Sequence, residues 1–80
     1  MPLFFFHLRN SEDLITDQIG RELAGLEEAR SEALVEARAL IAADARTGKI
    51  DFDQRIEVED ADGSIVHVLP LARAVVVKGE

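Results

Sequence analysis

The chain of 80 residues contains no cysteine, which excludes disulfides and thiolate metal sites. It also lacks tryptophan and tyrosine and has only two histidines. A domain of this size buries a modest share of its surface, and small folds usually gain stability from disulfides, a metal or oligomerisation. We therefore expect one domain, residues 1–80, that relies on close side-chain packing or on self-association.

Basic charge is also scarce, since 9 Lys and Arg residues stand against 16 Asp and Glu residues, for a net charge of −7. Proteins that bind nucleic acid draw most of their affinity from neutralising phosphates, and an anionic membrane makes a similar demand. The composition therefore argues against both partners. An acidic surface suits solubility, or contact with a basic protein.

No apolar run is long enough to span a bilayer. The apolar start, Met1–His7, is short and lacks the basic region and the long apolar region of a secretion signal. Hydrophobic residues make up 48% of the chain, which indicates a folded protein. We expect a soluble, cytoplasmic location.

No motif for catalysis or cofactor binding is present. The serines and threonines lie outside any nucleophile motif, and the 5 glycines are too dispersed to cradle a phosphate. General acid–base pairs need shielding from water, and the carboxylates of the helix described below are expected to be solvated. The sequence therefore predicts no catalytic residue, no cofactor and no enzymatic activity.

Metal binding is not predicted either. His7, His67 and Glu57 offer ligand types that zinc uses, but nothing in the sequence requires the two histidines to approach each other. The aspartates between residues 51 and 62 supply only part of a calcium loop, and turn formation explains them better.

The clearest pattern that is present is a helix. From Leu26 to Thr47 apolar residues return at helical spacing, and Gly48 fits the position that ends a helix. Alanines occupy the centre of the apolar stripe, so the helix can lie close to a sheet, with Phe4 and Phe6 filling the gap. The stripe consists of Leu26, Ala29, Ala33, Leu34, Ala37, Leu40 and Ile41.

Strand-like segments precede the helix. Leu3–Arg9 is rich in aromatic residues, which favour strands. A turn at residues 10–13 leads to a short strand at Leu14–Thr16, and Gly20 is expected to hold a positive φ angle. Alternation along the first strand predicts a core face of Phe4, Phe6 and Leu8 and an opposite face of Leu3, Phe5, His7 and Arg9.

A hairpin is predicted after the helix, from Arg55 to Leu69, with its turn at residues 60–63. A left-handed Gly63 pairs Asp60 with Ser64, which places Val58 opposite Val66 and Ile56 opposite Val68 on one apolar face. Pairing Glu59 with Ser64 instead would put His67 on that face, so the first register is preferred. Pro70 ends the strand, the residues after it form a turn or one turn of helix, and Val75–Val77 is predicted as a last short strand.

These segments predict an α+β fold in the order strand, strand, helix, strand, strand, with a short fifth strand. A single antiparallel-rich sheet would carry one helix packed on one face. The other face is too apolar for a purely solvated surface, and contiguous exposed apolar patches usually mark interaction sites. Unless the C-terminal segment covers that face, we predict an interface there formed by Phe5, His7, Ile65, His67 and Leu69.

Two stretches of the chain resemble a family of short uncharacterised proteins found mainly in alphaproteobacteria. They are the aromatic strand Phe4–Arg9 with the helix start Leu26–Ala33, and the hairpin Ile56–Pro70. The family is a domain of unknown function, so the resemblance implies a self-contained bacterial domain but no activity. The helix up to Ala37 is also similar to that of HicB-type antitoxin domains, which mask a basic toxin ribonuclease.

The sequence thus favours a small non-enzymatic module that binds a protein partner, or itself as a homodimer, through the uncovered sheet face. One alternative is an antitoxin-like inhibitor of a basic protein. The other is a small ligand-binding protein or enzyme whose site lies at a dimer interface.

Overall fold

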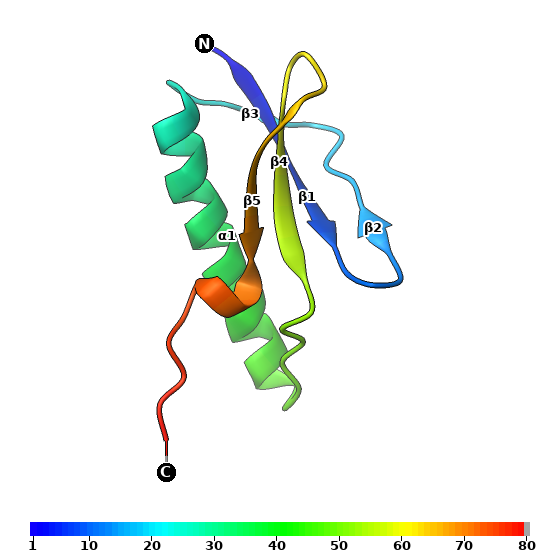
Figure 1. The fold of residues 1–80 in the computed structure, drawn as a ribbon, viewed down its shortest axis with the longest axis vertical. Coiled ribbons are helices and arrows are strands. Elements are labelled where there is room, and N and C mark those ends of the chain that lie inside the picture. The colour runs from blue at the N-terminus through cyan, green and yellow to red at the C-terminus, as the bar shows by residue number, and fades with distance from the viewer. Residues whose placement is uncertain (80) are drawn as a thin grey trace.

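The computed structural model describes residues 1–79 and contains one antiparallel sheet with a single helix lying against it (Figure 1). The five-stranded sheet has the order β2-β1-β4-β5, and β3 also pairs with β1. This arrangement confirms the predicted α+β class. The elements are β1 (Leu3–Arg9), β2 (Leu14–Ile15), β3 (Arg21–Glu22), α1 (Leu26–Arg46), β4 (Arg55–Asp60), β5 (Ile65–Pro70) and the single 3₁₀ turn η1 (Leu71–Arg73).

Strand β1 is central, since both of its sides are paired. On one side it runs antiparallel to the whole of β4, with Phe6 opposite Val58. On the other side β2 pairs with its last residues and β3 with its first, so these two short strands form one interrupted border. Strand β3 was not predicted, because Arg21 and Glu22 have little intrinsic preference for a strand and are held there by pairing with β1.

Helix α1 lies close to the sheet, as its alanine stripe predicts. Ala29, Ala33 and Ala37 are fully buried, and Phe4 and Phe6 of β1 belong to the same core. The helix ends one residue earlier than predicted, at Arg46, and Gly48 has a φ of 85°, the left-handed conformation expected just after a helix.

The turn η1 completes the core from a part of the chain that the sequence left undecided. Leu71 is fully buried, and its backbone N–H donates to the carbonyl oxygen of Gln54 at 3.0 Å. After this turn the chain leaves the sheet (Figure 1), and Arg38 of α1 donates from Nε to the carbonyl oxygen of Ala74. The prediction of a strand at Val75–Val77 is therefore wrong, because η1 directs these residues away from every strand among residues 1–79.

The register of the β4–β5 hairpin differs from the prediction. The turn itself is as expected, since the Asp60 N–H donates to the Ser64 carbonyl at 2.9 Å and Gly63 has a φ of 87°. A β-bulge then places one extra residue, Val66, in β5, so that Val58 lies opposite His67 and Ile56 opposite Leu69. An inserted residue reverses which side chains of the rest of the strand face the core. No residue type in this hairpin would have predicted the bulge from the sequence.

Candidate functional site

The sheet face that α1 leaves uncovered, the open face, has a regular order set by strand pairing. Phe5 of β1 lies opposite Glu59 of β4, which lies opposite Ile65 of β5. The next row runs from His7 through Glu57 to Val68. A column of glutamates therefore separates the β1 side chains from the apolar side chains of β5.

The predicted interface is divided between the two faces. Phe5, His7 and Ile65 lie on the open face, but His67 and Leu69 do not. These two residues pair with the buried residues Val58 and Ile56, so they face α1. The prediction that they belong to the open face is wrong, because the bulge reverses the orientation of β5. Val68 takes the place that Leu69 was expected to occupy.

The centre of the open face is a network of ion pairs. Arg9 and Arg55 both bind the Glu57 carboxylate, at 3.1 Å and 3.0 Å. Burial raises the pKa of Glu57, but hydrogen bonds from Arg55 and Arg9 lower it by more, so its pKa lies below the ordinary value. Because these charges are already paired with one another, the centre of the open face has few free charges for a partner to bind.

His7 connects β1 to β4 and to the interrupted border. Its Nδ1 accepts a hydrogen bond from the backbone N–H of Asp17 at 3.0 Å, and its Nε2 lies 2.7 Å from a Glu59 carboxylate oxygen. A backbone N–H can only donate, so Nδ1 carries no proton and the proton of the neutral ring is on Nε2. His7 is only 9% exposed and stacks on Phe5, so its position is that of a structural link.

Between β2 and β3, where β1 has no strand beside it on this border, the Asp17 side chain supplies the hydrogen-bond acceptor. Its carboxylate accepts hydrogen bonds from the backbone N–H groups of Phe6, Ile19 and Gly20 at 3.0–3.1 Å. Burial raises the pKa of Asp17, but these three donors and the Arg21 charge lower it by more, so its pKa lies below the ordinary value. The positive φ predicted for Gly20 is confirmed, at 77°, but the sequence gave no sign that Asp17 would complete the pairing of β1.

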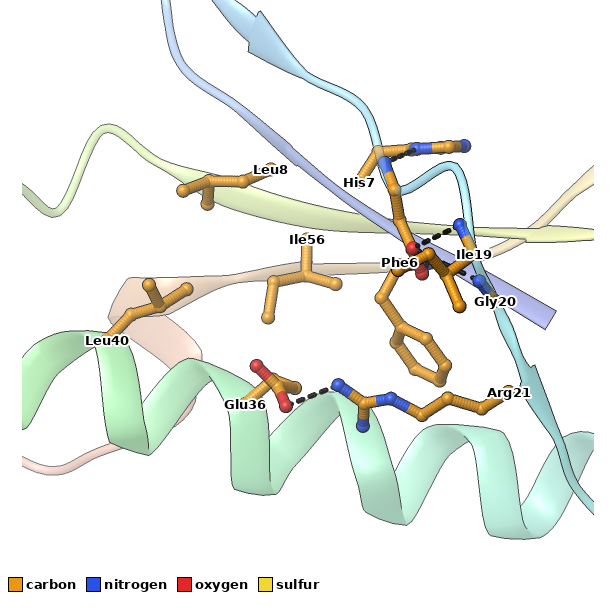
Figure 2. Close-up of a pocket in the computed structure, with 10 residues that line it drawn as sticks. Phe6, His7, Leu8, Ile19, Gly20, Arg21, Glu36, Leu40 and Ile56 are labelled. Carbon is orange, nitrogen blue, oxygen red and sulfur yellow. Dashed lines mark hydrogen bonds and ion pairs between the residues drawn. The ribbon is translucent and has the colours of Figure 1, made fainter.

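A hollow of about 360 Å³ lies between α1 and the interrupted border (Figure 2). Its apolar wall includes Phe6, Leu40 and Ile56. Arg21 lies over the Phe6 ring, 4.8 Å from the centroid, and pairs with Glu36 across the hollow. The charged groups that line the hollow are already paired, Arg21 with Glu36 and Asp17 with backbone N–H groups. Among residues 1–79, no buried side-chain nitrogen or oxygen lacks a hydrogen-bond partner.

His7 and His67, the two histidines of the chain, lie on opposite faces of the sheet and do not approach each other as zinc ligands would. Within the described part of the chain, no three His, Cys, Asp or Glu residues gather closely enough to hold an ion. The same residues include no helix that is both long and apolar enough to cross a membrane.

The outer border of β5 has no neighbouring strand among residues 1–79 to accept or donate its backbone hydrogen bonds. β5 is the last strand of the sheet, and Ile65 and Val68 on it are 49% and 45% exposed. Hydrogen-bonded pairs alternate along an antiparallel ladder, and the bond from Leu71 to Gln54 fixes that alternation. The N–H of Val68 therefore points away from β4, toward the free border.

Acid is expected to destabilise the fold in two stages. Burial lowers the pKa of His67 below its ordinary 6.5, and the Arg30 charge lowers it further. Just below pH 6.5 the unfolded chain then binds more protons than the folded chain, so stability falls with pH. Glu57 and Asp17 have lowered pKa values, so their contribution is lost as the pH falls below about 4.5.

Urea unfolding of the wild type and of His67→Gln, measured from about pH 8 to about pH 3, would separate the stages. The variant should lose the first decline in midpoint and keep the second. An unchanged first decline in the variant would rule out His67 as its source.

A single helix on one antiparallel sheet, with a hydrogen-bonded interrupted border on one side and a free strand on the other, defines a small α+β domain. Across residues 3–72 the chain matches a family described as a domain of unknown function, DUF6894, and it belongs to that family. This match confirms the resemblance to an uncharacterised family. Searches of curated proteins and of solved structures gave no match.

Proposed function

We propose that this domain is a non-enzymatic binding module that self-associates, and that its contact surface is the β5 border of the open face. The observation that carries the proposal is the combination of an unpaired backbone border with two exposed apolar side chains. Ile65 and Val68 lie side by side on β5, and the Val68 N–H points outward. An edge of this kind accepts a further strand through main-chain hydrogen bonds.

The other surfaces of the domain support the proposal because they fit the alternative functions poorly. At the centre of the open face, Glu57 is paired with two arginines and Glu59 accepts a hydrogen bond from His7. These carboxylates are therefore not free to bind a basic partner, as an antitoxin-like inhibitor would require. The hollow beside Arg21 contains apolar residues and paired charges, which gives an enzyme no free acid, base or nucleophile. Self-association also suits a domain whose own core is small.

The test is the solution mass of the protein as a function of concentration, measured by sedimentation equilibrium. The wild-type mass should rise from monomer toward dimer. Val68→Pro removes the outward N–H without touching the ladder to β4 and should remain monomeric. The matched control Val68→Thr keeps the N–H and a similar shape and should still associate.

A second variant, with two lysine substitutions, tests the same border in case the proline variant misfolds. Ile65→Lys together with Val68→Lys should also give a monomer, whereas Val35→Lys, at an exposed site on α1, should leave the mass unchanged. A wild type that is monomeric at every concentration, or a dimer that survives the β5 changes, would overturn the proposal.

A further inference from the structure

We propose that the strand received by β5 is the Val75–Lys78 segment of a second copy, added antiparallel and exchanged reciprocally between the two chains. This inference rests on the proposed function, because it names the partner of the same border. It accounts for three features of the C-terminal residues: their exposure, their direction and their charge.

The first feature is an apolar segment of strand-forming residues without a strand partner. Val76 and Val77 are 84% and 78% exposed, and no strand among residues 1–79 lies beside them. Valine is among the residues most enriched in strands, so this segment has the local preference for pairing but lacks a neighbour. Val75 and Val77 line one shallow hollow with Phe52 and Ala72, as alternate residues of an extended chain do.

The second feature is direction. In Figure 1 the C-terminal segment leaves η1 to one side of β5 and then runs in about the same direction as that strand, along the long axis of the molecule. A two-fold axis perpendicular to this course, placed between β5 and the C-terminal segment, reverses the direction of the second copy and brings its C-terminal segment beside β5. The C-terminal segment of each chain then lies antiparallel to β5 of the other, so both borders are filled by one symmetric operation.

The third feature is charge. In the antiparallel arrangement Lys78 approaches the start of β5, where the turn carries Asp60 and Asp62. A parallel arrangement would instead bring Lys78 toward Arg55, which pairs with the other end of β5 at Pro70. Opposite charges therefore favour the antiparallel choice, even though the chain as a whole is acidic, at −7.

The contact is short, so the association is expected to be weak. Four residues added to an edge bury less than a standard interface does, and reciprocal exchange compensates by forming two such contacts at once. We expect a dissociation constant in the micromolar to millimolar range. The segment also lies outside residues 3–72, the part of the chain that matches the family.

The experiment compares full-length variants by sedimentation equilibrium. Val76→Pro together with Val77→Pro removes two consecutive N–H groups, one of which faces β5 in either register. This double variant should raise the dissociation constant by about tenfold or more, the change expected for about 1.4 kcal/mol of lost strand pairing. The matched control, Val76→Thr together with Val77→Thr, keeps both N–H groups and the strand preference. Both positions are exposed, so folding should be unaffected, which circular dichroism verifies.

A charge exchange tests the direction of pairing. Lys78→Glu should weaken association by roughly two- to fivefold, and adding Asp62→Lys to the same chain should restore it. Failure of the double variant to recover would overturn the antiparallel arrangement.

The outcomes separate this inference from the proposed function. If the wild type dimerises and Val68→Pro is monomeric but the double proline variant at Val76 and Val77 still dimerises, the border associates by another route and the inference is wrong. If the wild type never dimerises, both are wrong.

Discussion

Leu71→Ala is expected to lower the free energy of unfolding by about 3 kcal/mol. Leu71 and Val58 are the largest fully buried side chains. Leu71 closes the space between α1 and the end of β5. Truncation removes the transfer energy of the lost methyl groups and leaves a cavity that rigid neighbours fill only in part. Small domains have little stability in reserve, so a loss of this size leaves a large unfolded fraction at room temperature.

The measurement is urea unfolding followed by circular dichroism. Leu14→Ala on β2 is the matched control, because the same change at an exposed side chain should cost less than about 1 kcal/mol. Equal losses at the two sites would mean that Leu71 does not lie in the core as described.

Asp17→Ala is expected to cost about 2–4 kcal/mol, the second largest effect. The change removes the acceptor of three backbone N–H groups, of which the Phe6 N–H belongs to the central strand. A donor left without an acceptor in a partly buried site costs more than the net value of the bond it had formed. The interrupted border should then separate from β1 before the rest of the sheet unfolds.

Hydrogen exchange gives the most direct reading of that local opening. The Phe6 amide should exchange faster in Asp17→Ala, while amides in the middle of α1 should change only by the global loss of stability. Asp17→Asn keeps one carbonyl acceptor and should fall between the wild type and the alanine variant. Fast Phe6 exchange already present in the wild type would contradict the role given to Asp17.

The elements that were predicted correctly from the sequence are those whose structure depends on residues close by in the chain. The alanine stripe of α1, the aromatic alternation of β1 and the glycines after the helix and in the hairpin turn each depend on neighbours a few residues away. Their positions were confirmed to within a residue at the end of the helix, and both glycines have the expected positive φ.

What the sequence did not reveal depends on distant contacts. The bulge at Val66 has no residue signature, and it alone moved His67 and Leu69 from the predicted interface to the helix side. Strand β3 and the role of Asp17 both require β1 as a neighbour. The strand predicted at Val75–Val77 is wrong because residues that favour strands still need a neighbouring strand, and none pairs with them among residues 1–79.

The interrupted border on the far side of β1 also limits how large an assembly can become. Strands β2 and β3 are two residues each, and the bend between them is held by Asp17, so this side offers no continuous template for another chain. A sheet that accepts neighbours on both sides can polymerise without limit, whereas this one can grow in one direction only. In the proposed reciprocal exchange, the partner fills the one continuous border of each chain, so association is expected to end with a closed pair and concentrated solutions should stay clear of fibrils.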